Sequence, residues 1–142
     1  MILDAELMFS EDQAVTASAA STNYIDLGVA RDIGNGENLY LVLLVTETMD
    51  DAGDDSTLAV TLQTDDNTSF SSATTLETLT TFAALTAAGT VVYKRIDPAS
   101  YERYIRLYYT TANGDLSAGK FTAFITKDIQ KYADYASGYS IA

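Results

Sequence analysis

Short stretches of alternating apolar and polar residues run along much of the chain. In one of them, Leu58, Val60 and Leu62 alternate with threonine and glutamine side chains. Alternation with a period of two residues is typical of a β-strand that buries one face and exposes the other. The pattern predicts half-buried strands over three segments: 57–63, 104–109 and 120–126.

The stretch from Leu39 to Thr46 departs from this alternation because it is apolar on both faces. Such a run is typical of a strand that is covered on both sides, so a central strand is predicted here. Weaker patterns predict five further strands, over Leu7–Phe9, Val15–Ala17, Tyr24–Leu27, Leu76–Thr81 and Val91–Ile96.

The alternation also predicts which side chains share the interior, because every second residue of a strand points to the same side. We predict one hydrophobic core that contains Leu41, Leu43, Leu58, Val60, Leu62, Ile105, Leu107 and Ile125.

Turn-forming residues separate the predicted strands. Gly34-Asn35-Gly36 precedes the central strand and Asp50–Asp55 follows it. Asp97-Pro98 leads into Ala99–Glu102, for which a single helical turn is predicted. Eight or nine short strands without a strong helix between them favour an antiparallel β-sandwich or jelly roll over a parallel α/β sheet. We therefore expect an all-β jelly-roll domain of about eight strands over residues 1–127.

The last residues, 128–142, follow a different pattern. Ile129, Tyr132, Tyr135 and Tyr139 recur at spacings of three and four, which would place them on one stripe of a helix. A helix this short is marginal by itself. We interpret the segment as a tyrosine-bearing C-terminal arm that needs a surface to lie on. A frayed terminus is the alternative.

Composition narrows the possible functions. The 142 residues include no Cys and no His, and the formal net charge is −12. These absences exclude disulfides, cysteine nucleophiles, imidazole-based triads and nearly all zinc sites. The negative charge argues against binding to nucleic acid or to an anionic membrane, since both need Lys and Arg. Met1–Ser10 lacks the pattern of a targeting signal, and the longest aliphatic-aromatic run, Leu39–Val45, is too short to span a membrane. A soluble protein is expected.

Two acidic loops are candidate calcium sites, because calcium prefers oxygen ligands. In Asp50–Asp55, Ala52 occupies a ligand position and Asp55 the glycine position of the usual calcium loop. In Asp65–Ser69 the ligand positions fit better, but Phe70 stands where glycine is needed. We interpret both loops as solvated turns and predict that the protein needs no metal and no cofactor.

No pattern predicts catalysis. Gly34-x-Gly36 lacks the third glycine of a phosphate loop and precedes a strand instead of a helix, so we interpret it as a turn. A glycosidase needs only two carboxylates, but most of the 20 acidic residues lie in polar loops, where a raised pKa is not expected. We predict that the protein is not an enzyme.

The tyrosines are the most informative feature. Tyr104, Arg106 and Tyr108 should share one face of a strand whose other face is also apolar. Tyr and Arg are enriched at the energetic centres of protein interfaces. We predict a protein interface formed by this face together with the arm residues Tyr132, Tyr135 and Tyr139. The alternative for the strand face is that a second sheet packs on it while the Arg106 head reaches solvent.

Several segments, taken in order, are similar to those of the small capsid cement proteins of tailed bacteriophages. The resemblance covers nearly the whole chain, and the loop before the central strand departs from the family pattern by carrying Asn35 where Arg is usual. The segments that carry it are Met1-Ile2-Leu3-Asp4 with Leu7 and Phe9, Gln13-Ala14-Val15-Thr16, Ala19-Ala20-Ser21-Thr22, Asp32–Glu37 running into Leu39–Val42, Leu62-Gln63-Thr64-Asp65 followed by Phe70 and Thr74-Thr75-Leu76, Arg103–Tyr109, and Ala118-Gly119-Lys120 with Ala123–Gln130.

The resemblance implies a jelly-roll protein that is made in the host cytoplasm and binds the outer surface of an icosahedral capsid. It also implies that the major capsid protein is the partner, that neighbouring capsomers are bridged, and that the chain forms homo-oligomers, with a dimer favoured and a trimer possible. No catalytic residues follow from it. Two alternatives stay open: a carbohydrate-binding jelly roll for host attachment, and a hydrolase with paired carboxylates.

Overall fold

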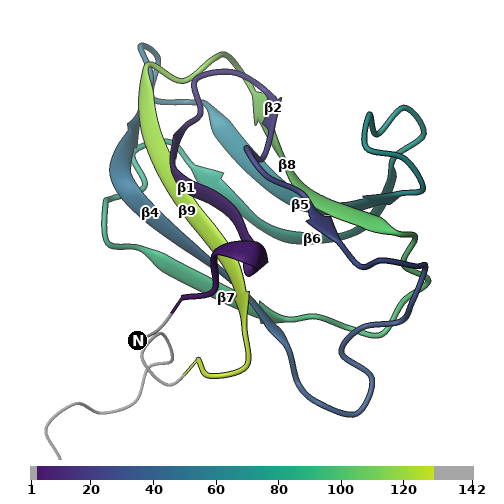
Figure 1. Ribbon diagram of the computed structural model, residues 1–142. Coiled ribbons are helices and arrows are strands. Elements are labelled where there is room, and N and C mark those ends of the chain that lie inside the picture. The colour runs from purple at the N-terminus through teal and green to yellow at the C-terminus, as the bar shows by residue number, and fades with distance from the viewer. Residues whose placement is uncertain (1–2, 130–142) are drawn as a thin grey trace, which may run out of the picture.

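Two antiparallel β-sheets packed face to face form the fold of the computed structural model, which describes residues 3–129 (Figure 1). One sheet has the strand order β1-β9-β4-β7, and the other has the order β2-β8-β5-β6, with β3 also paired to β8. This order is that of an eight-stranded jelly roll in which β2 and β3 share the place of one strand. The strands are β1 (Met8–Ala14), β2 (Ala19–Ala20), β3 (Ile25–Asp26), β4 (Tyr40–Asp50), β5 (Thr57–Asp65), β6 (Thr74–Ala83), β7 (Val91–Arg95), β8 (Tyr104–Ala112) and β9 (Ala118–Thr126).

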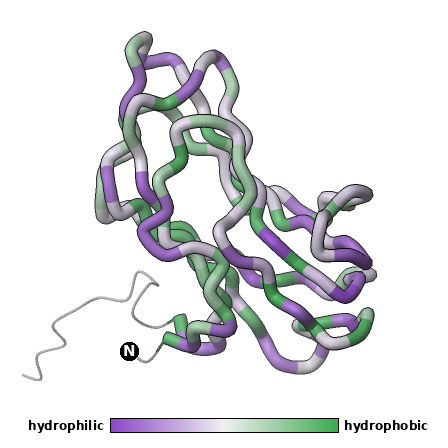
Figure 2. The backbone as a smooth tube through the Cα atoms, turned by 45° about the horizontal axis from the view of Figure 1, so that its top comes forward, coloured by the Kyte–Doolittle hydropathy of each residue, from purple (hydrophilic) through white to green (hydrophobic). Residues whose placement is uncertain are grey.

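The core lies between the two sheets, where the inward-facing residues of both meet. All eight side chains predicted to share one interior are buried in a single cluster, so this prediction is confirmed. The cluster is extended by aromatic residues that include Phe9, Phe121 and Tyr109. Along the strands the backbone colouring of Figure 2 changes repeatedly between hydrophobic and hydrophilic, as expected for strands with two unlike faces.

The predicted central strand is β4, which lies between β9 and β7. Its residues Leu41, Leu43 and Val45 belong to the main core. Val42, on the opposite face, is also fully buried, in a second small cluster with Met8 and Phe124. The prediction of a strand that is apolar and covered on both faces is therefore confirmed.

The helical turn predicted for Ala99–Glu102 is wrong. Residues 96–102 are an irregular connection between the sheets. The ring of Tyr101 packs into the core, and its hydroxyl donates a hydrogen bond to the carbonyl oxygen of Asp97 at 2.9 Å. The helical turn found in residues 3–129 is instead a short 3₁₀ turn at Ala5–Leu7, where the Asp4 carboxylate accepts a hydrogen bond from the backbone amide of Glu6. Residues 3–129 contain no helix that could cross a lipid bilayer.

The weaker strand predictions are only partly correct near the N-terminus. Residues 15–17 are not a strand, although Val15 is buried and its amide donates a hydrogen bond to the carbonyl oxygen of Gly119 at 3.0 Å. The predicted Tyr24–Leu27 strand is reduced to β3. Short strands of this kind depend on their partner, here β8, more than on their own pattern.

The Gly34-Asn35-Gly36 segment is a turn, as interpreted from the sequence. Gly34 has a φ of +78°, and a Cβ atom added there would lie 2.7 Å from the carbonyl oxygen of Ile96. Ile96 in turn donates its amide hydrogen to the carbonyl oxygen of Leu39 at 2.8 Å. The glycine therefore allows this loop to approach the chain that leaves β7.

Candidate protein interface

The outward face of β8 carries the three strand residues predicted to form an interface. Tyr104, Arg106 and Tyr108 are half-buried, whereas the residues between them, Ile105 and Leu107, are fully buried in the core. The second sheet of the sandwich packs against that buried side. The alternative in which a second sheet covers the outward face is therefore wrong for the part of the chain that the structure describes, residues 3–129.

The guanidinium of Arg106 lies over two aromatic rings. Its guanidinium carbon lies 4.3 Å from the ring centroid of Phe70 and 5.3 Å from that of Tyr108. Its Nε atom donates a hydrogen bond to Oε1 of Gln63, the residue opposite it on β5, at 2.9 Å. Partial burial lowers the pKa of the guanidinium, but arginine keeps its charge in proteins. Arg106 thus presents an oriented, partly desolvated cation.

Phe70 reaches Arg106 because the loop between β5 and β6, residues 66–73, is folded around the side chain of Asp65. The Asp65 carboxylate is fully buried and accepts hydrogen bonds from the amides of Asp66 at 2.7 Å and Ser72 at 2.8 Å. The side-chain amide of Asn67 adds a third bond at 2.8 Å. Burial alone would raise the pKa of Asp65, but these donors lower it overall.

A second arginine extends the aromatic cluster toward β3. Tyr24 makes an edge-on contact with Tyr104, with 5.6 Å between ring centroids, and lies 6.1 Å from Phe70. Arg103 stacks on Tyr104 at 5.0 Å and forms a bidentate ion pair with Asp26, with N···O distances of 2.8 and 2.9 Å. The hydrogen bonds from Arg103 lower the pKa of Asp26 to about 2. Because this ion pair is exposed, its main effect is to orient the guanidinium.

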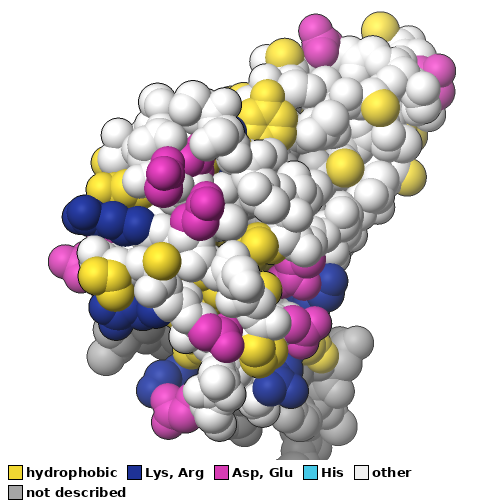
Figure 3. Space-filling model, turned by 90° about the vertical axis from the view of Figure 1, so that its right-hand side faces the viewer, with side chains coloured by type: hydrophobic (Ala, Val, Ile, Leu, Met, Phe, Trp, Pro, Cys, Tyr) yellow, Lys and Arg dark blue, Asp and Glu magenta, His cyan; other side chains and the backbone are white. Residues whose placement is uncertain are grey.

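Together these contacts form a continuous patch that we call the arginine–aromatic surface, made of Tyr24, Phe70, Arg103, Tyr104, Arg106 and Tyr108. Figure 3 views the molecule from the side of β8, β5 and β6, and its lower half mixes hydrophobic, basic and acidic side chains. Tyr24 is the most exposed aromatic ring of the patch, with 48% of its surface accessible. Such a mixture of rings and oriented cations is suited to binding another protein.

Sequence reasoning missed two of the aromatic residues of this surface, Tyr24 and Phe70. Phe70 carried one usable signal, since it is the large apolar residue of an otherwise polar loop. The arm residues predicted to join the interface, Tyr132, Tyr135 and Tyr139, lie outside the described residues.

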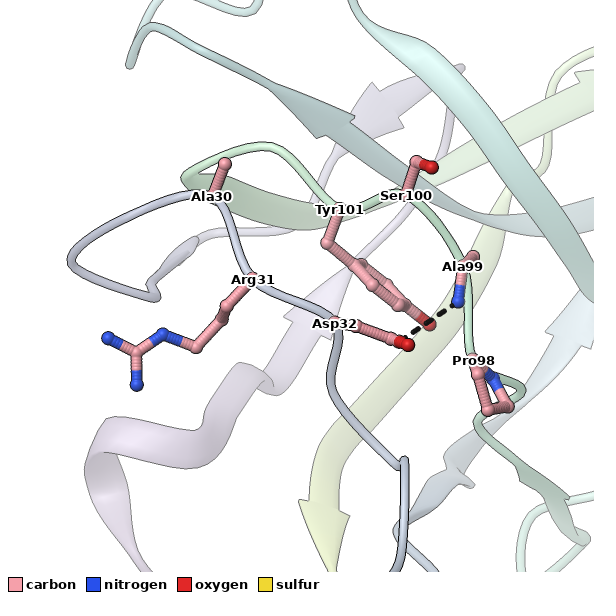
Figure 4. A pocket seen from close by; sticks show the side chains of 7 residues that line it. All are labelled: Ala30, Arg31, Asp32, Pro98, Ala99, Ser100 and Tyr101. Carbon is pink, nitrogen blue, oxygen red and sulfur yellow. Dashed lines mark hydrogen bonds between the residues drawn. The ribbon is translucent and has the colours of Figure 1, made fainter.

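A shallow surface hollow is lined by polar side chains that include Arg31, Asp32 and Tyr101. It lies between the segments 30–32 and 98–101, and Figure 4 shows that the Arg31 side chain points away from the other labelled residues. An oxygen of Asp32 accepts a hydrogen bond from the amide of Ala99 at 3.1 Å (Figure 4). The hydroxyl of Tyr101 is held by Asp97, and burial raises its pKa. The Asp32–Ala99 bond therefore joins the two segments, and the Tyr101–Asp97 bond stabilises the second of them.

The acidic loops are built around buried carboxylates, which differs from the solvated turns expected from the sequence. Asp51 is buried and accepts hydrogen bonds from the hydroxyl of Ser56 and, at 3.0 Å, from its amide. These bonds lower the pKa of Asp51. Both bonds end on one carboxylate oxygen, Oδ2, whereas Oδ1 is buried and has no hydrogen-bond partner within residues 3–129. Within residues 3–129, no group of three or more acidic side chains is arranged to hold a metal ion.

Comparison with known proteins places the chain in a family. The family model described as Bbp16 matches residues 9–125, which includes every strand from β2 to β8, most of β1 and β9, and the whole arginine–aromatic surface. No curated protein matches the chain.

Proposed function

The chain belongs to the Bbp16 family, and we propose that it is a cement protein of a phage capsid, bound to the outer surface of an icosahedral head where it bridges neighbouring major capsid subunits. The proposed role is binding and not catalysis. Membership in a phage-related family supports the setting. The jelly-roll sandwich and the resemblance of its segments to cement proteins support the role.

One observation carries the proposal: the arginine–aromatic surface is organised before any partner binds. Phe70 and Tyr108 hold the Arg106 guanidinium, and Asp26 holds that of Arg103. Side chains that are already ordered lose little conformational entropy on binding, and rings and guanidinium groups are typical energetic centres of interfaces. We propose that this surface contacts the capsid, with acidic and apolar groups as its counterpart.

The mechanism follows from mass action. A protein that binds sites present on the assembled shell but absent from dissociated subunits stabilises the shell by its binding free energy at each occupied site. Bridging needs two contacts per bound unit, which homo-oligomerisation would supply. A dimer is the oligomer that the cement-protein resemblance favours.

The proposal is tested by sedimentation with intact capsids that lack the protein. Wild-type chain should pellet with the capsids, whereas Arg106→Ala and Tyr108→Ala should weaken the affinity roughly 10- to 100-fold, the range expected for interface centres. Leu85→Ala is the matched control. Leu85 is exposed in the turn after β6, at the opposite end of the sheet from Tyr104, and this variant should bind like the wild type.

Two results would refute this assignment. If the wild type does not pellet with capsids, the cement role is wrong. If it pellets and both surface variants bind equally well, the interface lies elsewhere on the molecule. Binding of the purified protein to glycans without capsid binding would favour the carbohydrate-binding alternative.

A further inference from the structure

A row of apolar side chains crosses the outer face of the β1-β9-β4-β7 sheet, on the side opposite the core. Met8 on β1 lies opposite Phe124 on β9. Phe124 lies opposite Val42 on β4, and Val42 lies opposite Tyr93 on β7. All four strands therefore contribute one apolar or aromatic residue to a single transverse row.

This row is buried in a place where a two-sheet sandwich usually meets solvent. Val42 is 0% exposed, Phe124 is 1% exposed and Met8 is 9% exposed. They form a hydrophobic cluster separate from the main core, against which Leu44 and Val91 also pack. The outer face of an antiparallel sheet is commonly polar, so an apolar face of this kind calls for a cover. Tyr93, at the end of the row, is still 41% exposed.

Ile129 indicates what the cover is. It is the last residue that the structure describes, and it already packs against this cluster. The sequence continues for 13 residues beyond it and places Tyr132, Tyr135 and Tyr139 at helical spacing with Ile129. The outer strands of a four-stranded sheet lie about 15 Å apart, and 13 helical residues span about 20 Å, so the segment is long enough to cross the row.

We propose that residues 130–142 pack across this outer face of their own chain, with the rings of Tyr132, Tyr135 and Tyr139 over the row formed by Met8, Phe124, Val42 and Tyr93. Attachment to the same chain is favoured because the segment starts on the cluster, which gives it a high effective concentration there. The proposal gives the arm an intramolecular partner in place of a capsid contact. It is independent of the cement role.

The test uses the whole 142-residue chain in solution. Nuclear Overhauser effects should connect the ring protons of the three arm tyrosines with the methyl groups of Val42 and Leu44. In a mixture of differently labelled chains these effects should remain within one chain. Replacing all three tyrosines by serine should lower the melting temperature by several degrees.

Asp134→Ala combined with Ser137→Ala is the matched control, because a helix places both residues away from the tyrosine stripe. This variant should keep the contacts and the melting temperature of the wild type. Contacts seen only between differently labelled chains would overturn the proposal in favour of a second copy as the partner. An absence of contacts in the wild-type protein would overturn it outright, whatever the stability of the variants. Neither result depends on capsid binding.

Discussion

Leu107 and Tyr108 are adjacent on β8 but lie on opposite faces, which makes them a sharp test of the strand register. A slip of one residue would exchange the two faces of the strand. Leu107 is 0% exposed in the core, whereas Tyr108 is half-buried on the outer face. Truncating each side chain to alanine should therefore have very different effects on the free energy of unfolding.

The expected cost of Leu107→Ala follows from its surroundings. Losing three buried carbon groups removes about 2.4 kcal/mol of transfer free energy. A cavity cost is added because the backbone cannot relax inward. Ser21 binds both the carbonyl oxygen of Leu107, at 2.9 Å, and its amide, at 3.1 Å, on one edge, while Leu62 pairs with it on the other. We expect a total loss of about 3–5 kcal/mol.

Tyr108→Ala should cost less, about 1 kcal/mol, because it removes a half-exposed ring and its contact with Arg106 at 5.3 Å. Urea unfolding followed by circular dichroism at 218 nm or a similar wavelength measures both values, and the m-value checks that unfolding stays two-state. A loss below about 1 kcal/mol for Leu107→Ala, or a larger loss for Tyr108→Ala than for Leu107→Ala, would refute the register and with it the arginine–aromatic surface.

Three further predictions concern the titratable groups and the acidic loops. Because the folded-state pKa of Asp65 is lowered, its contribution to stability is present above the ordinary carboxyl pKa of about 4 and is lost as the pH falls through the folded-state value. Asp65→Asn should therefore make the melting temperature fall less steeply as the pH is lowered. An unchanged acid limb of the melting temperature–pH profile would contradict this. Burial raises the pKa of Tyr109 to about 12, so its contribution to stability is present below pH 10 and is lost between about pH 10 and 12. Tyr109→Phe should remove this loss of stability at high pH. The variant should cost about 1–2 kcal/mol of stability at neutral pH, since the hydroxyl of Ser10, 2.7 Å away, loses its hydrogen-bond partner. Adding EDTA should leave the melting temperature unchanged within about 1 °C, because the Asp65 carboxylate is satisfied by hydrogen-bond donors and residues 3–129 contain no group of three or more acidic side chains arranged to hold a metal ion. A clear decrease would point to a bound cation.

Much of the fold could be predicted from the sequence because strand alternation is a local property. The alternation identifies the residues that share one face of β5, namely Leu58, Val60 and Leu62, whatever packs against that face. It does the same for Tyr104, Arg106 and Tyr108 on β8. The turns between the strands could also be predicted, since glycine is favoured where the backbone needs a positive φ, as at Gly34. Together these signals were enough to predict an antiparallel sandwich and the members of its core.

The failures occur where a segment takes its conformation from a distant partner. Ala99–Glu102 has the composition of a helical turn, but Tyr101 packs into the core and the amide of Ala99 donates to Asp32, so the segment is irregular. Residues 15–17 alternate weakly and are not a strand, whereas β2, which was not predicted, pairs with β8. In both cases the hydrogen bonds that decide the outcome join residues far apart in the sequence.

The residues of the candidate interface also fall into those that the local sequence pattern predicts and those that only the tertiary structure brings together. The sequence alone determined that Tyr104, Arg106 and Tyr108 share a face, because period-two geometry leaves no other arrangement once β8 is a strand. Only the tertiary structure brought Phe70 over Arg106 and Tyr24 against Tyr104. Those contacts depend on the register between strands and on the loop folded around Asp65. Neither is encoded in a local pattern, since both arise from pairings between segments that meet only when the two sheets assemble.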